Sequence, residues 1–294
     1  MFVEAIEKVD LFTRPIHTIS RTYGGLVTPG SATLFFVNDE GVAVTCKHVL
    51  NVIAQADGIN KHYAQFRTER DTLPRDTYLK KKLRELEFKY KFNNDTLIQT
   101  KNNFINTFDL ISDIQCHAHP TLDLAILVFK GFSKKYYQGY ATFLKDTSRI
   151  KQGRYLCRLG YPFPEFNNFE YNTGRDDIEW TNKGNPNSPR FPLDGIITRF
   201  VGTEQHQLTA IEMSTPGLRG QSGGPLFDRD GIIYGMQHQT SHLHLGFDMK
   251  DKEIIQDGKR TKVSNYPFLH VGHCIHVDRI KDFLREHDIK YYES

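Results

Sequence analysis

Short apolar runs separated by polar turns recur along this chain and predict an all-β protein. Residues 32–37 and 42–50 are two such runs, joined by a polar turn at 38–41. A further run covers residues 122–129 and carries one carboxylate, Asp123, near its start. Strands of this length and spacing suit barrels better than an α/β sheet. We therefore expect antiparallel β-barrels.

One segment in the first half of the chain departs from the strand pattern. Within residues 75–92, the basic run at 80–86 predicts a helix. After it, Phe88, Tyr90 and Phe92 alternate with charged residues, which predicts a short strand. This segment lengthens the stretch between two barrel strands, so we expect a helical insertion in the first barrel. A solvated surface helix is its simplest interpretation.

Two segments in the second half are also distinct. Residues 163–192 are rich in Asn, Gly, Pro and charge, which predicts a long loop. Residues 278–287 place Ile280, Phe283 and Leu284 at helical spacing. This spacing predicts a C-terminal helix that packs against the body of the protein.

These patterns divide the chain into four parts. A lead-in covers residues 1–22, and a first barrel covers 23–130, with the insertion at about 60–100. A linker covers residues 131–148. A second barrel with the C-terminal helix covers 149–294.

Composition and charge narrow the classes of partner. The hydrophobic fraction of 38% and the charged fraction of 25% are those of a soluble globular protein. A net charge of +3 is too small to favour nucleic acid as a partner. Neither a basic, apolar signal peptide nor a run long enough to span a bilayer is visible. We expect neither nucleic acid nor a membrane among the partners.

Cysteine and histidine placement bears on redox state and metals. Each cysteine lies in or beside an apolar segment, where a free thiol behaves as a small hydrophobic group. Reduced cysteines and the missing signal peptide favour a cytoplasmic location. Neither residues 116–119 (Cys-His-Ala-His) nor the set His238, His242 and His244 has paired metal-ligand spacing. We therefore expect no metal and no cofactor. The four cysteines are Cys46, Cys116, Cys157 and Cys274.

The most distinctive chemistry is a serine among glycines, in the segment Gly220-Gln221-Ser222-Gly223-Gly224-Pro225-Leu226. A serine hydroxyl becomes a nucleophile only when a base removes its proton, and the oxyanion that follows needs preorganised donors. Glycines allow the backbone N–H groups of Gly220 and Ser222 to point at one spot. The alternative is that these glycines form only a turn between strands.

Two upstream residues supply the remaining groups of such a site. We expect His48 to end a strand, and Asp123 heads an apolar run, where an unpaired carboxylate is costly to bury. A carboxylate that accepts the Nδ1 proton of a histidine leaves its Nε2 free as a base. Asp109 and Asp113 lie nearby, but neither precedes a comparable apolar run.

Three motifs carry a family resemblance: Thr45-Cys46-Lys47-His48-Val49, Asp123-Leu124-Ala125 and the eleven residues from Pro216 to Leu226. With them, the chain resembles chymotrypsin-fold (trypsin-like) serine proteases, and within these the HtrA-like bacterial branch. The order His, Asp, Ser is that of chymotrypsin and differs from that of subtilisin. The segment after Ser222 is too short for the PDZ domain that this branch usually adds.

This resemblance implies a fold and an activity. The fold is all-β, with two six-stranded antiparallel barrels, a helical insertion in the first and a C-terminal helix. The activity is endopeptidase cleavage of a protein or peptide through an acyl-enzyme, with His48, Asp123 and Ser222 as the triad. The Gly220 and Ser222 N–H groups would form the oxyanion hole. The alternative is a silent or latent protease fold kept as an interaction module.

The resemblance also places the primary substrate pocket. Its floor would come from the segment before the serine and one wall from a following strand. No carboxylate stands in the floor segment, so cleavage after Lys or Arg is disfavoured and a small or apolar P1 residue is expected. A histidine near this strand resembles the pocket of glutamyl endopeptidases, but it stands one position out of register. The pocket residues are Thr215, Pro216, Gly217 and Leu218, with His238, Gln239 and Thr240.

One departure from the family bears on activation. Secreted trypsins pair a new N-terminus with an aspartate just before the serine, where this chain has Gln221. Activation by N-terminal processing is therefore not expected. Either the site is permanently competent, or loop ordering or partner binding activates it. Residues 70–92 are a candidate docking element for such a partner or for an acidic substrate segment. Protein quality control and a bacterial stress or antiphage system both remain open as pathways.

Overall fold

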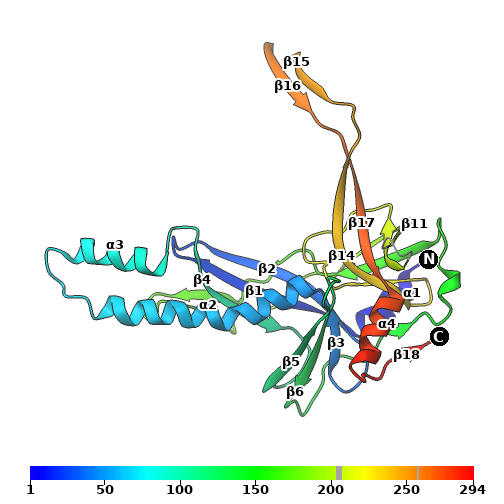
Figure 1. The fold of residues 1–294 in the computed structure, drawn as a ribbon, viewed down its shortest axis with the longest axis horizontal. Helices are drawn as coiled ribbons and strands as arrows, with labels where there is room; N and C mark the ends of the chain where they lie inside the picture. Colours follow the sequence, from blue (N-terminus) through cyan, green and yellow to red (C-terminus); the bar gives the residue numbers. More distant parts are fainter. Residues whose placement is uncertain (203–206, 257) are drawn as a thin grey trace.

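The computed structural model describes residues 1–202, 207–256 and 258–294 (Figure 1). Its first sheet has six antiparallel strands in the order β4-β1-β2-β3-β6-β5. The strand β3 is buried along its whole length, and only the last residue of β6 is exposed, because both face the core. The strands are β1 (Thr13–Thr22), β2 (Val27–Phe36), β3 (Val42–Thr45), β4 (Leu97–Phe104), β5 (Asp113–Ala118) and β6 (Ala125–Lys130).

The second sheet closes on itself. Six strands follow the order β13-β8-β11-β12-β17-β14, and β13 pairs with both β8 and β14, which completes a ring. Closure leaves no open edge within this ring. Two short strands, β7 (Thr142–Phe143) and β18 (Tyr292–Glu293), extend the sheet beyond β14. The ring contains β8 (Tyr155–Gly160), β11 (Phe191–Gly202), β12 (Leu208–Met213), β13 (Pro225–Phe227), β14 (Ile232–His244) and β17 (Phe268–His276).

This architecture confirms the predicted all-β fold built from two six-stranded antiparallel units. One apolar core joins the two sheets, with Phe35 of the first sheet beside Phe143 of the second. Within the described residues, the first sheet is curled but its outer strands β4 and β5 do not pair. The C-terminal helix is also confirmed as α4 (Val277–Glu286), which buries Phe283 and Leu284.

The helical insertion is confirmed, and it is longer than expected. A helix α2 (Lys47–Asp71) and a helix α3 (Leu79–Tyr90) form a hairpin (Figure 1). The helix α2 runs along β4, where Asn60 is hydrogen-bonded to Thr100, and the far end of the hairpin extends beyond the sheet. The expected strand carrying Phe88 and Tyr90 is wrong, because both residues lie in α3. Leu83, Leu86 and Tyr90 recur at helical spacing and pack beside Phe66 of α2, which favours continuing the helix.

The start of α2 corrects a second expectation. The strand β3 ends at Thr45, so His48 lies in the first turn of α2 and does not end a strand. Near the N-terminus, the predicted lead-in holds a helix α1 (Val3–Asp10) and β1, which lies between β2 and β4 in the first sheet. The strand was missed because Thr, Arg and His interrupt its apolar positions.

Residues 163–192 are not the open loop that their composition predicts. They contain a hairpin of β9 (Phe169–Asn172) and β10 (Asp177–Trp180), and Ile178 packs against Ile19 of β1. At the hairpin turn, Asp176 has a φ of +50° and accepts hydrogen bonds from Arg70 and Tyr63 of α2 at 2.9 and 2.8 Å. The hairpin is therefore tied to the helical insertion.

A second hairpin projects from the molecule in a different direction from the helical hairpin (Figure 1). It consists of β15 (Met249–Gln256) and β16 (Lys259–Asn265), beyond the ends of β14 and β17 (Figure 1). None of the four cysteines forms a disulfide, and three of them are buried. No helix in the described parts of the chain is both long and apolar enough to cross a membrane.

Candidate active site

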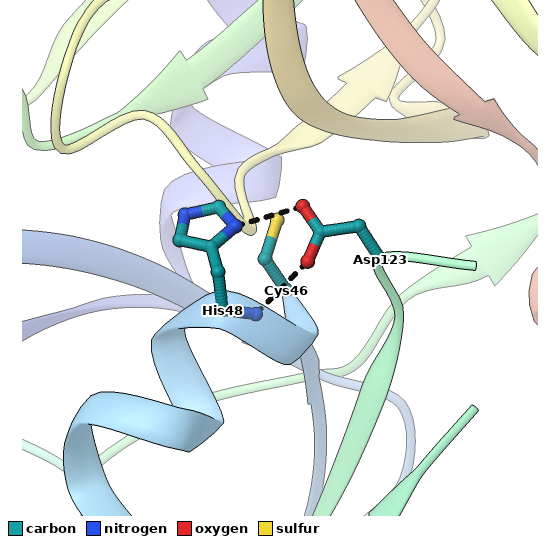
Figure 2. A group of neighbouring side chains, drawn as sticks. All are labelled: Cys46, His48 and Asp123. Atoms are coloured by element: carbon teal, nitrogen blue, oxygen red, sulfur yellow. Dashed lines mark hydrogen bonds and ion pairs between the residues drawn. The ribbon is translucent and has the colours of Figure 1, made fainter. Parts of the chain in front are cut away.

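His48 and Asp123 meet at the junction between α2 and the loop before β6 (Figure 2). The Nδ1 atom of His48 lies 2.7 Å from Oδ2 of Asp123. The backbone N–H of His48 donates to Oδ1 of the same carboxylate at 2.9 Å. Asp123 therefore fixes both the ring and the backbone of His48. The imidazole side chain is 52% exposed, so the remainder of the ring is open to a reactant.

The local sequence explains why a carboxylate lies at this point. Cys46, the residue before α2, makes no side-chain hydrogen bond to the first turn of the helix. The free N–H groups of a helix N-terminus attract negative charge. Asp123 supplies that charge from another part of the chain.

Asp123 is ionised at neutral pH. Burial alone would raise its pKa, but contacts with His238 and His48 outweigh burial and hold the pKa well below its usual range. The Nδ1 atom of His238 lies 3.8 Å from Oδ2 of Asp123. His238, predicted as a pocket wall, thus directs its ring toward this carboxylate.

The loop around Ser222 depends on glycine at two positions. Gly220 and Gly223 have φ angles of +90° and +87°, which residues with a Cβ rarely adopt. A Cβ on Gly223 would lie 2.0 Å from the carbonyl oxygen of Thr33. A Cβ on Gly220 would lie 2.5 Å from the carbonyl oxygen of Tyr161. The two glycines therefore allow the loop around Ser222 to pack directly against both sheets.

Thr33 of β2 is a positioning residue that sequence reasoning missed. Its backbone N–H donates to the carbonyl of Ser222 at 3.0 Å, and its hydroxyl donates to the carbonyl of Gly220 at 2.7 Å. Its own carbonyl accepts a hydrogen bond from the Thr45 hydroxyl at 2.7 Å. These bonds join the serine loop to the first sheet, whose strand β3 leads into the helix that carries His48.

Gln221 supports the same loop from the other side. It is fully buried, and its Nε2 donates to the carbonyl of Phe191 at 3.0 Å. Its Oε1 accepts a hydrogen bond from the N–H of Leu218 at 3.0 Å. The amide is thus satisfied within the chain. The N–H groups of Gly220 and Ser222 donate to no other group in the described residues, and both stay available to a ligand.

A groove on the surface contains residues of both the histidine and the serine segments. Its volume is about 310 Å³, and it is lined by His48, Gly220 and Ser222 together with apolar residues of α2. The first turns of the insertion helix therefore form one wall of the groove. The apolar residues of that wall are Val49, Val52 and Ile53.

The predicted pocket residues lie together on the second barrel. The hydroxyl of Thr240 donates to the carbonyl of Gly217 at 2.7 Å, and the N–H of Gly272 donates to the carbonyl of Thr215 at 2.9 Å. Hydrogen bonds therefore join the segment 215–218 to the strand β14 on one side and to β17 on the other. Sequence reasoning missed Arg158 of β8, whose guanidinium contacts Thr215.

Cys46 joins His48 and Asp123 in a cluster of three groups that lie close enough to share a metal ion (Figure 2). Burial is the largest cause that raises the pKa of the Cys46 thiol, and the nearby Asp123 carboxylate adds to it. A cysteine binds a metal ion as a thiolate, and a raised pKa disfavours that form. The donor set therefore favours acid–base chemistry over metal binding.

Comparison with known proteins places the chain among peptidases. The sequence model of the trypsin-like peptidase domain matches residues 30–236, which contain His48, Asp123 and Ser222. The chain is similar to the active form of the Rv3671c protease from M. tuberculosis, at 11% identity over 98% of this chain and 86% of that one, with a TM-score of 0.48.

A second solved structure, the HtrA-type protease AlgW with a tripeptide, is 12% identical over 97% of this chain and 62% of that one, with a TM-score of 0.46. No curated protein matches the sequence of this chain.

Proposed function

The chain belongs to the family of trypsin-like serine peptidase domains, and from this premise we propose that it is an endopeptidase acting through His48, Asp123 and Ser222. His48 takes the proton of the Ser222 hydroxyl as the hydroxyl attacks the peptide carbonyl. Asp123 keeps the Nδ1 proton of His48 in place and stabilises the imidazolium. Water then hydrolyses the acyl-enzyme.

The observation that carries this proposal is the double contact of Asp123 with His48. A carboxylate that accepts from both the backbone N–H and Nδ1 allows only the tautomer whose Nε2 is a base. The neighbouring groove brings this base and Ser222 to one surface. The N–H groups of Gly220 and Ser222 supply the proposed oxyanion hole, in which each donor contributes about 3 kcal/mol.

The proposal extends to substrate preference and control. No acidic residue occurs among Thr215, Pro216, Gly217 and Leu218, which supports a non-basic P1 residue. Because the amide of Gln221 is satisfied inside the chain, the serine loop needs no freshly cut N-terminus. Control would then come from loop ordering or from a partner.

Active-site labelling tests the proposal directly. A fluorophosphonate forms a covalent bond only with a serine that a neighbouring base has activated. We expect the wild type to be labelled and the Ser222→Ala variant to remain unlabelled, as read by intact-protein mass. A wild type that resists labelling, while its circular dichroism shows a folded chain, would support the alternative of a silent interaction module.

We also propose that the outer face of α3 docks an acidic partner or substrate segment. Lys80, Lys81 and Arg84 are exposed on this helix, although Lys81 lies 3.9 Å from Glu85. Lys82 is paired with Asp76 at 2.7 Å. An exposed basic surface raises the rate at which acidic chains associate by about 10-fold or more at low salt.

Charge reversal of this surface tests the docking proposal. The triple variant Lys80→Glu, Lys81→Glu, Arg84→Glu is expected to lower kcat/KM for an unfolded acidic protein about tenfold. Cleavage of a short uncharged peptide should be unchanged. Salt at about 0.5 M should remove the difference between the variant and the wild type, because it screens surface charges strongly. The control reverses three exposed lysines elsewhere, Lys130, Lys145 and Lys151. Equal losses in both triple variants would contradict a specific docking surface.

A further inference from the structure

A buried cation lies at the base of the predicted substrate pocket. Arg158 of β8 is 0% exposed, and its Nη2 donates to the carbonyl and hydroxyl of Thr215 at 3.0 and 2.6 Å. Nη2 also reaches the carbonyl of Pro216 at 3.2 Å. A Cβ on Gly272 would lie 2.2 Å from Nη1, so glycine at this position makes room for the guanidinium.

Gln237 of β14 lies between this cation and the pocket. Its Oε1 accepts a hydrogen bond from Nη1 of Arg158 at 2.6 Å, and its Nε2 donates to the carbonyl of Gln239 at 2.7 Å. A Cβ on Gly217 would lie 2.2 Å from that Nε2. The amide therefore occupies the space that a side chain at 217 would take, between the two predicted sides of the pocket.

In the described residues no carboxylate contacts Arg158, and Asp194 acts on its charge without forming a salt bridge. Each of its hydrogen bonds goes to a neutral oxygen, and its Nε has no partner in the described residues. Burial lowers the pKa of Arg158, but a guanidinium stays charged at neutral pH. A buried cation without a counter-ion is destabilising, so a binding site that contains one favours an anion.

We propose that Arg158 makes this pocket selective for an acidic P1 residue, with glutamate as the best fit, an inference that rests on the proposed peptidase function. The side chain of Gln237 has the same shape as glutamate, and its Oε1 stands where a substrate carboxylate oxygen would bind Nη1. On substrate binding, the Gln237 amide turns away and the carboxylate takes its hydrogen bond. The pocket thereby gains the counter-ion that it lacks, and P1 lysine or arginine is repelled.

The discriminating comparison is between glutamate and glutamine at P1, because the two side chains differ in charge and hardly in shape. Four peptides that are identical except for P1 Glu, Gln, Leu or Arg are assayed for kcat/KM with the wild type. We expect glutamate to exceed glutamine by at least about 100-fold, since a charge-assisted hydrogen bond in a buried site replaces a neutral one.

Variants at Arg158 separate a specificity role from a structural one. In Arg158→Met, the preference for glutamate over glutamine should fall to within about fivefold, while cleavage after leucine stays within about tenfold of the wild type. Arg158→Lys should retain part of the preference, because it keeps the charge. Equal loss of cleavage for all four peptides in Arg158→Met would show that Arg158 only supports the pocket, and would overturn the proposal.

The outcomes distinguish this inference from the peptidase proposal. Cleavage that depends on Ser222 but shows no preference of the wild type for glutamate over glutamine overturns the role of Arg158 and leaves the peptidase intact. This result needs no variant, so it stands even where Arg158→Met does not fold. Absence of both fluorophosphonate labelling and peptide cleavage in the wild type overturns both proposals.

Discussion

Replacing Ser222 with alanine is expected to lower kcat by about 10⁶-fold, the scale on which loss of the nucleophile acts in serine proteases. Alanine removes the hydroxyl that forms the acyl-enzyme but leaves the glycine turns and the hydrogen bonds of Thr33 in place. The melting temperature should therefore change little. The loss is measured by steady-state cleavage of a fluorogenic peptide, at enzyme concentrations high enough to detect the residual activity.

A matched serine and a double variant sharpen this result. Ser148 is exposed in the short 3₁₀ helix at Thr147–Arg149, and Ser148→Ala should cleave like the wild type. Adding His48→Ala to Ser222→Ala should cost nothing further, because a nucleophile and its base act as a unit. A second large, multiplicative loss in the double variant would mean that His48 serves some other step.

The site shows what local sequence can and cannot reveal. His48, Asp123 and Ser222 each stand in a short motif, and the cost of an unpaired acid beside an apolar run already pairs Asp123 with a base. Thr33 has no such signal. Its hydroxyl contacts Gly220 across 187 positions of sequence, and a threonine in a strand usually only packs.

The burial of Arg158 could not be predicted from the sequence, for a related reason. In sequence, an arginine inside the run Tyr155 to Gly160 reads as a solvent-facing position of a barrel strand, whereas the structure buries it completely. What makes burial possible is the absence of a side chain at Gly272, far along the chain, and the carbonyls of the segment before Ser222. Neither condition can be inferred from the strand itself.

The fold has the same division between local and distant causes. Apolar runs were enough to predict the all-β fold and the C-terminal helix, since burial on one or both faces determines those patterns. The hairpin at β9 and β10 was not predicted, because its composition is typical of loops. It is held by contacts with distant partners, among them the hydrogen bonds from Tyr63 and Arg70 to Asp176.

The second large effect is expected at Asp123. Replacement by asparagine should lower kcat by about 10⁴-fold at neutral pH, because an amide offers one acceptor oxygen where the carboxylate offers two. The backbone N–H and Nδ1 of His48 now both donate to Asp123, at 2.9 and 2.7 Å. If the amide oxygen keeps the backbone bond, the NH₂ group faces Nδ1 and forces the proton onto Nε2. His48 can then no longer accept the proton of Ser222.

Proton positions on His48 provide the decisive measurement. Nitrogen NMR of the labelled imidazole should show the Nδ1–H tautomer in the wild type and the Nε2–H tautomer in Asp123→Asn. Asp113→Asn, at the start of β5, is the matched control and should leave both tautomer and kcat unchanged. A loss of less than tenfold in Asp123→Asn, with the Nδ1–H tautomer retained, would assign the orientation of His48 to another group and remove Asp123 from the triad.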